Sequence, residues 1–203
     1  DLYTKGHVEV QDEGSQLLSL LTGAKRGEMV VDFCAGAGGK TLSLGAMMRN
    51  TGRLYAFDIS GHRLEKLKPR LARSGLSNVY SAQIAHENDD RIKRLRGKID
   101  RVLVDAPCSG LGTLRRNPDL KWRQSPKAVA EMQVKQLAIM NSAVRLLKPG
   151  GRIVYATCSL MPAENEVVAA QFSEAHPELI KVSALDILTQ SGVENAATLV
   201  NDL

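Results

Sequence analysis

The sequence of 203 residues contains few aromatic residues and no long apolar run. Phe, Trp and Tyr make up 4% of the chain, so we expect a core built from Leu, Val, Ile and Ala. No run of about 18 apolar residues occurs, so no membrane-spanning helix is expected. The first residues do not read as a secretory leader, and the length suits one domain with a sizeable core. We therefore expect a single cytoplasmic domain over residues 1–203.

Cysteine is also scarce, with Cys34, Cys108 and Cys158 as the three examples. An odd number argues against a disulfide framework, and the spacings match no zinc pattern, so no metal site is predicted. Free thiols are typical of a reducing compartment. A lone cysteine is more often a small buried side chain than a reactive one, and we expect that of Cys34.

Positive charge exceeds negative charge by a modest margin, with a formal net charge of +5. This excess favours a polyanionic partner. Basic residues cluster at 63–73, 91–98 and 115–123. The first two clusters fall on expected helices and can be solvated faces. The third lies in an expected loop beside Trp122, where basic groups can hold phosphates and the indole can stack on a base.

Apolar runs and helical patterns alternate along the chain. Strands are expected at 29–33, 53–58, 78–83, 99–105 and 152–157, and helices at 14–21, 40–48, 61–73, 126–147 and 163–174, with a helical turn at 91–95. Residues 106–125 read as a polar loop, 179–182 as a weak strand, and 184–203 as a tail without assignment. Nearly continuous apolar strands indicate a parallel sheet covered on both faces, hence a doubly wound α/β domain. Ligands of such sheets bind at the carboxyl ends of the strands.

A glycine-rich loop, VVDFCAGAGGKT at 30–41, follows the first strand. It ends like a P-loop but has Cys34 in place of the first glycine, and it lacks the third glycine of the dinucleotide fingerprint. Gly36 and Gly38 let the backbone approach a ligand, and the following helix N-terminus favours a phosphate or a carboxylate. A turn without a ligand is the alternative.

Acids stand at three strand ends. Asp58 follows the glycines by about 20 residues, where a carboxylate receives the hydroxyl pair of a ribose. Asp32 is expected to support the loop from inside. Asp105 can bind a ligand or cap a turn. Lys40 can contact a ligand or merely occupy the first turn of its helix.

Two cysteines stand after neighbouring strands, Cys108 in DAPCSG at 105–110 and Cys158 in ATCSLMPAENE at 156–166. Together these segments resemble the paired cysteine motifs of the RNA 5-methylcytosine methyltransferases of the Sun (or Fmu) type. FCAGAGGKT resembles that family's CAAPGGKT loop, which binds S-adenosylmethionine. RRNPDLKW and VQDEGSQL resemble its flanking segments, and the likeness runs from about Val8 to Phe172.

The resemblance implies a Rossmann-like class I methyltransferase domain, a structured RNA as partner and a monomer. Cofactor contacts are expected at Cys34, Ala35, Gly36, Ala37, Gly38, Gly39, Lys40, Asp58, Arg63 and Asp105. RNA contacts are expected at Arg115, Arg116, Lys121 and Trp122.

The family pattern also implies a mechanism. Carbon 5 of cytosine is too weak a nucleophile to take a methyl group until a thiolate adds at carbon 6. By resemblance, Cys158 is that nucleophile, Asp105 binds the ring nitrogen and amine of the base, and Cys108 assists the final elimination. Loss of Cys108 is expected to leave RNA joined to the protein. The target cytidine must be unpaired or flipped out.

The sequence departs from the family in three places. The loop reads AGAGG instead of AAPGG. Ala85 stands where an acid approaches the adenine amine, so Glu87, Asp89 or a backbone group would have to substitute. The closing aspartate–glycine–diaromatic segment and the N-terminal RNA-binding domain are not in the sequence, as in a fragment whose RNA binding is incomplete.

The expected function is methylation of carbon 5 of cytosine in RNA, with ribosomal RNA ahead of transfer RNA. One alternative is a methyltransferase for DNA or a small molecule; DNA cytosine enzymes take their nucleophile from the strand-four cysteine, here Cys108. Another is an RNA-binding assembly factor that has kept the fold and lost the cofactor, which Ala85 keeps open.

Overall fold

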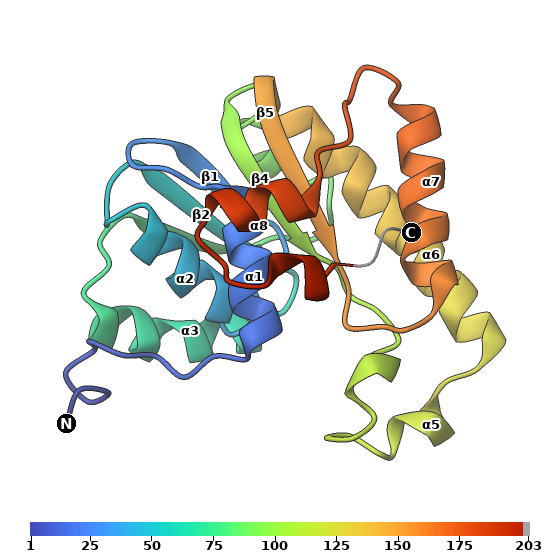
Figure 1. Cartoon of the computed structure of the whole chain (residues 1–203), viewed down its shortest axis with the longest axis horizontal. Helices are drawn as coiled ribbons and strands as arrows, with labels where there is room; N and C mark the ends of the chain where they lie inside the picture. Colours follow the sequence, from blue (N-terminus) through green and yellow to red (C-terminus); the bar gives the residue numbers. More distant parts are fainter. Residues whose placement is uncertain (201–203) are drawn as a thin grey trace.

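The computed structural model describes residues 1–200 and contains one parallel sheet in the order β3-β2-β1-β4-β5 (Figure 1). The strands are β1 Met29–Asp32, β2 Arg53–Asp58, β3 Val79–Gln83, β4 Ile99–Asp105 and β5 Leu147–Ala156. Because β1 pairs with both β2 and β4, the strand order reverses between β1 and β4. This confirms the predicted doubly wound α/β fold, in which ligands bind at such a reversal.

Helices connect the strands and pack on both faces of the sheet. Their bounds are α1 Glu13–Thr22, α2 Gly39–Met47, α3 Gly61–Ser74, α4 Asp90–Lys93, α5 Leu120–Arg123, α6 Pro126–Ala143, α7 Glu166–Ala175 and α8 Ala184–Gln190. Short 3-10 turns lie at Leu111–Thr113, Val144–Leu146, Pro162–Glu164 and Ala196–Thr198. Within residues 1–200, none of these helices has both the length and the apolar character needed to cross a bilayer.

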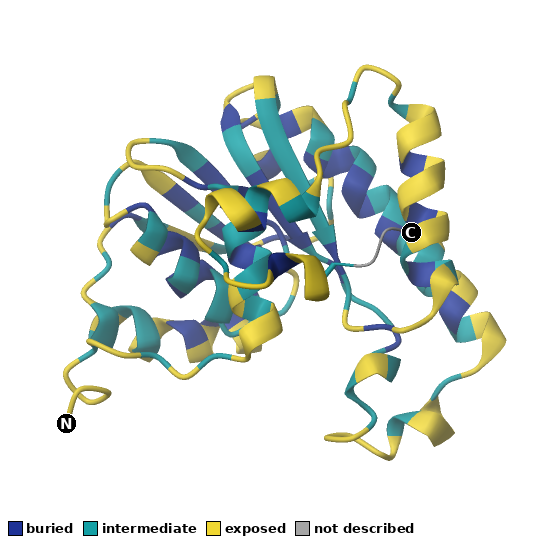
Figure 2. Cartoon of the chain, viewed as in Figure 1, coloured by how far each residue is buried: buried dark blue, intermediate teal, exposed yellow. Residues whose placement is uncertain are grey.

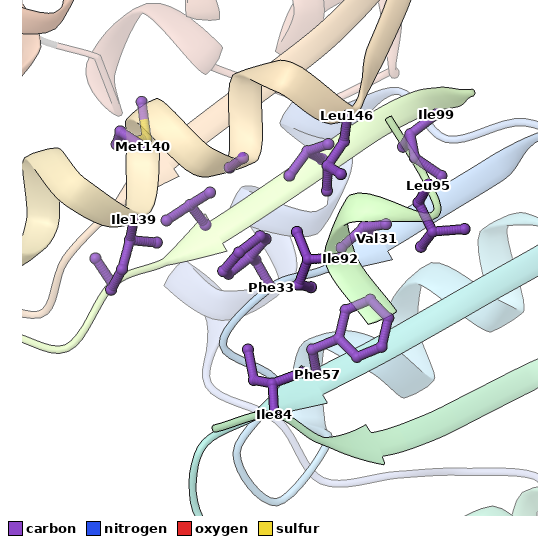
Figure 3. Close-up of a cluster of buried hydrophobic side chains, with 14 of the residues drawn as sticks. Val31, Phe33, Phe57, Ile84, Ile92, Leu95, Ile99, Ile139, Met140 and Leu146 are labelled. Atoms are coloured by element: carbon purple, nitrogen blue, oxygen red, sulfur yellow. The ribbon is translucent and has the colours of Figure 1, made fainter. Parts of the chain in front are cut away.

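Alternating strand residues point to opposite faces and build separate clusters. The cluster on the face of α2 contains Val30, Leu44, Met48, Leu54 and Leu103. The cluster on the face of α6 contains Val31, Phe33, Val102, Val104, Ile139 and Met140 (Figure 3). Buried residues therefore concentrate on the strands and on the inner faces of the helices, while most of α7 is exposed (Figure 2).

The structure differs from the sequence-based prediction at the C-terminal end. Residues 179–182 form no strand, so that prediction is wrong; Ile180 is 88% exposed and the segment connects α7 to α8. Part of the unassigned tail forms α8, which packs on α1 through the buried Leu188. Residues 201–203 of that tail lie outside the described residues.

The helix after the polar loop ends earlier than expected, at Ala143 rather than at position 147. Leu147 already pairs with Ile99, so β5 includes the Lys-Pro-Gly-Gly segment that was expected to end the helix. A register shift between Ile99 and Arg101 accommodates this segment. The polar loop at 106–125 contains a 3-10 turn and α5, whereas the sequence predicted no helix there.

The acid that ends β1 ties the glycine loop to the sheet. Asp32 is 1% exposed, and its Oδ2 accepts a hydrogen bond of 2.7 Å from Oγ1 of the buried Thr41 in the first turn of α2. Its Oδ1 has no hydrogen-bond partner among the described residues. Burial raises the pKa of Asp32 to about 7; the Thr41 hydroxyl opposes this rise, and the nearby Asp105 and Asp58 carboxylates add to it. Asp32 thus supports the loop from inside, as predicted.

This raised pKa predicts a pH-dependent cost to stability. The folded protein holds a proton on Asp32 that the unfolded chain releases between pH 3.8 and about 7, so stability falls as pH rises through that window. We expect Asp32→Asn, which cannot ionise, to gain stability over wild type by about 1–4 kcal/mol near pH 8, with little difference near pH 4. Urea unfolding across this range measures the difference.

The matched control is Asp90→Asn, because Asp90 is exposed and forms a surface ion pair with Lys93. Its stability difference from wild type should stay small at every pH. A difference for Asp32→Asn that did not grow with pH would contradict the assignment of the buried proton.

Candidate active site

The carboxyl ends of β1, β2, β4 and β5 surround a cavity of about 1150 Å³. The cavity is also lined by residues of α1 and α6 and by Leu188 and Leu199 near the C-terminal end. Of the predicted site residues, it is lined by Cys34, Ala35, Gly36, Ala37, Gly39, Lys40, Asp58, Arg63, Asp105, Cys108, Arg116 and Cys158. Its size suits a nucleoside-sized ligand together with part of a second molecule.

The glycine loop needs its glycines for two different reasons. Gly36 has a φ of +56°, and a Cβ placed there would meet nothing within 4 Å, so it leaves open space beside the backbone. Gly38 has a φ of +84°, and a Cβ there would lie 2.0 Å from Cδ1 of Leu67, so this glycine allows α3 to pack against the loop. The first turn of α2 follows without a side-chain cap and lines the cavity through Gly39 and Lys40.

Sequence reasoning missed the ion pairs that hold this loop from behind. Arg70 donates 2.7 Å to the Ala37 carbonyl and 3.0 Å to Oε1 of Glu9, which also pairs with Arg73. Burial opposes ionisation of Glu9, but hydrogen bonds and charge from Arg73 and Arg70 outweigh it and lower its pKa. Glu9 lies 61 residues before Arg70, so no local pattern shows the pairing. Two arginines of the first basic cluster therefore have structural partners.

Asp58 follows β2 and faces the loop, as its proposed role requires. Its Oδ2 accepts a 2.8 Å hydrogen bond from the Gly36 N–H, and its Oδ1 accepts one of 2.7 Å from the Ser60 N–H. The residue is 5% exposed and lines the cavity. A carboxylate has about four acceptor positions, so each oxygen can still accept one ligand hydroxyl. Ribose binding by Asp58 stays a prediction.

The adenine side of the expected site contains Glu87 rather than Ala85. Ala85 is exposed and does not line the cavity; its N–H donates 3.0 Å to Oδ2 of Asp89. Asp89 caps the start of α4, and these backbone hydrogen bonds from Ala85 and Arg91 lower its pKa. Glu87 and Ile84 line the cavity. Of the two acids considered as substitutes, only Glu87 therefore faces the ligand space among the described residues.

Cys108 and Cys158 face each other across the ends of β4 and β5. Their sulfur atoms are 3.0 Å apart, and both thiols are free. A disulfide would bring the sulfurs to about 2 Å, so this contact is a hydrogen bond between thiols. The Cys158 N–H also donates 3.3 Å to Sγ of Cys108. The structure thus brings together the two thiols that the motifs singled out, 50 residues apart in the chain.

The pKa values of the two thiols shift in opposite directions. A hydrogen bond from Cys108 lowers the pKa of Cys158 to about 7; burial and the Asp105 carboxylate oppose this shift, and the Lys40 ammonium assists it. The same hydrogen bond, together with burial, raises the pKa of Cys108. The thiolate is the nucleophilic form of cysteine, so the lowered pKa of Cys158 is what a nucleophile at this position requires, while the sulfur–sulfur contact by itself allows either thiol to donate.

Lys40 and Asp105 form an ion pair of 2.7 Å at the cavity wall. Their side chains are 14% and 32% exposed, so the pair is accessible to a ligand. Cys34, by contrast, packs partly buried against the core cluster on the face of α6, and burial raises the pKa of its thiol. Its expected role as a small side chain without thiol chemistry agrees with this environment, while its backbone borders the cavity.

The predicted RNA residues separate into two places. Arg116 lines the cavity and pairs with Asp12 at 3.0 Å. Arg115, Lys121 and Trp122 are exposed and lie outside the cavity lining, on residues 115–123, which include α5 and are called the α5 segment below; α5 lies away from the sheet (Figure 1). Trp122 is 81% exposed, and the Lys121 ammonium lies 4.7 Å from its ring centroid.

A second omission of the sequence reasoning is Glu164. It lies within the second cysteine motif, yet the segment was expected to begin a helix. In the structure it is 0% exposed and hydrogen-bonds to the serine that follows each cysteine. In residues 1–200, no group of three or more His, Cys, Asp or Glu side chains is arranged to hold a metal ion.

Comparison with known proteins agrees with the motifs. The family model of the 16S rRNA methyltransferase RsmB/F matches residues 19–200. A probable ribosomal RNA small subunit methyltransferase B from Synechocystis sp. is 38% identical over 178 residues, covering 87% of this chain and 39% of that protein. Its counterpart from Bacillus subtilis is 34% identical over 177 residues, with the same shares covered. The chain thus spans about two fifths of the length of these relatives.

Solved structures give the same result for the fold. NSun6 from Pyrococcus horikoshii with SFG has a TM-score of 0.77 at 29% identity, over 86% of this chain and 44% of that one. A methyltransferase homolog protein from Pyrococcus horikoshii has a TM-score of 0.74 at 34% identity, over 86% and 53%. The fold is therefore the Rossmann-like methyltransferase fold that the sequence predicted. With its paired thiols at the ends of β4 and β5 and a family match over residues 19–200, the chain belongs to the 16S rRNA methyltransferase RsmB/F family.

Proposed function

We propose that this chain transfers a methyl group from S-adenosylmethionine to carbon 5 of cytosine in RNA, through a covalent bond between Cys158 and the base. The observation that carries the proposal is the pair of free thiols 3.0 Å apart, of which Cys158 has the lowered pKa. The names of the curated relatives support ribosomal RNA ahead of transfer RNA.

The residues around the glycine loop fit S-adenosylmethionine, which supplies the methyl group when bound. Gly36 leaves open space beside its backbone, and Asp58 has acceptor positions for a ribose hydroxyl pair. The uncapped first turn of α2 offers N–H donors to a carboxylate. Arg63 and Glu87 line the same cavity. The relative NSun6 with SFG, an analogue of this cofactor, supports the assignment.

Cys158 begins the proposed reaction by adding to carbon 6 of the cytosine. The S–C bond that forms leaves carbon 5 enamine-like and therefore nucleophilic. Near neutral pH a thiol with a pKa of about 7 is about half ionised, so Cys158 needs no separate general base to become nucleophilic. In this proposal Cys108 is the donor in the 3.0 Å sulfur–sulfur contact and stabilises the Cys158 thiolate until it attacks.

Asp105 and Lys40 are assigned to the polar edge of the base. In this proposal Asp105 hydrogen-bonds the cytosine at ring nitrogen 3 and at the exocyclic amine, which draws electrons from carbon 6. The Lys40 ammonium, 2.7 Å from Asp105, orients that carboxylate and adds positive charge where electron density increases. Without a cytosine in the cavity, the Lys40 ammonium and the Asp105 carboxylate compensate each other's charge.

Cys108 completes the proposed cycle. Once carbon 5 carries the new methyl group, its proton must leave so that the S–C bond to Cys158 can break. In the adduct Cys158 no longer holds the Cys108 proton, so Cys108 releases it to solvent and becomes a thiolate. This thiolate accepts the carbon 5 proton, and the released electron pair re-forms the ring double bond as the Cys158 sulfur departs.

The RNA is proposed to enter beside the α5 segment with its target cytidine unstacked. Because both cysteines line the cavity, the base must leave any helix to reach them, at a cost of about a few kcal/mol. The exposed Trp122 offers a stacking surface, and Arg115 and Lys121 offer charge to phosphates. Arg116 lines the cavity and so lies nearer the flipped nucleotide.

The first test is cofactor binding by calorimetry. We expect wild type to bind S-adenosylmethionine and Asp58→Asn to bind it roughly ten- to a hundredfold more weakly, because a hydrogen bond to a charged acceptor contributes about 1.5–3 kcal/mol. Asp90→Asn, a surface change far from the loop in sequence, should bind as wild type does. No binding by wild type at millimolar concentration would favour the RNA-binding assembly factor instead.

The second test is methyl transfer to unmodified RNA with labelled cofactor. Wild type should form 5-methylcytidine, Cys158→Ala should lose turnover by about a thousandfold or more, and Cys108→Ala should yield an RNA–protein adduct that survives denaturation. An adduct with Cys158→Ala instead would assign the nucleophile to Cys108, as in enzymes that act on DNA. Cofactor binding measured on both variants separates a lost nucleophile from a damaged fold.

The third test concerns RNA affinity, measured by fluorescence anisotropy with an RNA hairpin. Trp122→Ala should weaken binding by roughly five- to a hundredfold, because stacking on one base contributes about 1–3 kcal/mol. Arg115→Ala should weaken it and reduce the slope against salt concentration by about one counterion. Lys68→Ala, on the solvated face of α3, is the control and should change neither value. Equal affinity of all four proteins would remove the α5 segment from the RNA site.

A further inference from the structure

A buried carboxylate connects the two cysteine motifs. Glu164 is 0% exposed and accepts four hydrogen bonds. The Ser109 N–H donates to Oε1 at 2.7 Å, and the Ser109 hydroxyl donates to Oε2. Ser159 also donates its hydroxyl to Oε2, and the two serine hydroxyls lie 3.1 Å apart. Each serine directly follows one of the paired cysteines, so one carboxylate holds both cysteine loops.

The network continues into α6 through a buried glutamine. Nε2 of the fully buried Gln136 donates 3.1 Å to Oε1 of Glu164 and 3.0 Å to the Pro107 carbonyl. The Tyr155 hydroxyl donates 2.6 Å to the backbone carbonyl of Glu164, which fixes the 3-10 turn. Burial opposes ionisation of Glu164, but the hydrogen bonds from Ser109, Ser159 and Gln136 outweigh it and lower its pKa. A charged group with this many partners sets positions tightly.

We propose that Glu164 is a positioning residue, which clamps the loops after β4 and β5 together so that the sulfur atoms of Cys108 and Cys158 stay in hydrogen-bond contact. Glu164 does not touch the cavity that holds these sulfurs; it acts through the two serines. The inference rests on the proposed function for its catalytic meaning, but it concerns the geometry of the thiol pair and is tested on the protein alone.

The clamp has a measurable effect on the ionisation of Cys158. The groups that face this thiol are Cys108, Asp105 and Lys40, and Arg116 and Lys135 line the same cavity. Among these, the hydrogen bond from Cys108 is the largest influence, and it requires the 3.0 Å contact. When the loops separate, this hydrogen bond is lost while the surrounding charges remain. The pKa of Cys158 then rises toward that of an ordinary thiol.

The experiment is alkylation of Cys158 by iodoacetamide as a function of pH, followed by mass spectrometry of its peptide. Only the thiolate reacts, so the pH of half-maximal rate reports the ionisation independently of access to the thiol. Wild type should show a midpoint near pH 7. We expect Glu164→Ala to raise the midpoint by roughly one unit or more, with alkylation at pH 7 about tenfold slower.

Conservative and control variants separate positioning from general stability. Glu164→Gln keeps the shape and one oxygen, and its amide can donate to the serine hydroxyls, so it should restore most of the wild-type midpoint. Glu166→Gln removes an exposed carboxylate from the same motif and should leave the midpoint unchanged. Ser159→Ala frees one loop and should give an intermediate shift. Thermal unfolding is measured for every variant.

The outcome is decisive whether or not Glu164→Ala folds. If it folds, an unchanged midpoint overturns the proposal. If it does not fold, Ser159→Ala decides: a raised midpoint at wild-type melting temperature supports the clamp, and an unchanged midpoint rejects it. Because neither RNA nor S-adenosylmethionine is present, a failure of methyl transfer leaves this result unaffected, and the two proposals fail separately.

Discussion

The parallel pairing of β4 with β5 is the constraint on which the site depends. It places Asp105 opposite Ala156, so the chain leaves both strands at the same level. The loops that follow must then carry Cys108 and Cys158 toward each other, although 50 residues separate them in sequence. A shift of this register by one residue would turn the strand residues to the opposite face and separate the thiols. The packing of the sheet and the contact between the two thiols therefore both require the same register of β4 against β5.

Four carboxylates in and beside the cavity differ in their burial and in their hydrogen-bond partners. Asp32 is buried and ties α2 to the sheet through Thr41, while Asp58 already receives two backbone N–H groups. Glu164 stays ionised without contact with the cavity, because its partners are close donors. Asp105 alone of these four combines a salt bridge with substantial exposure. Burial and hydrogen bonding thus assign different protonation states to carboxylates within one small region.

The sequence predicted the elements that depend on local patterns. Apolar runs predicted all five strands. The glycines, the acids at the strand ends and the two cysteine motifs predicted where the cavity lies, because each of these features directly follows a strand. The strand expected at 179–182 was wrong, since an apolar run at the protein surface lacks a strand to pair with. The early start of β5 was missed because Pro149 and the adjacent glycines usually end an element rather than lie within a strand.

Local sequence patterns could not predict the contacts between residues that lie far apart in the chain. Glu9 binds Arg70 and Arg73, and Glu164 binds Ser109, across separations of more than 50 residues. Basic residues at 70 and 73 read as a charged helix face, because their partner precedes the first helix. Glu164 lay inside a motif already recognised, yet it fell in a helix expected at 163–174, and no role was assigned to it. Only the fold shows that these side chains are buried or part-buried with partners.

The proton on Asp32 links ligand binding to solution conditions. Asp32 lines the cavity, and its pKa is raised to about 7, chiefly by burial and also by the charges of Asp105 and Asp58. A cation that enters the cavity favours the charged carboxylate and so drives out a proton. The measured enthalpy of binding such a ligand then includes the heat of protonating the buffer. The apparent affinity of the ligand increases with pH until Asp32 is already ionised. A positive charge in the cavity and a proton on the buried Asp32 therefore oppose each other through the electrostatic field, without contact between the cation and the carboxylate oxygens.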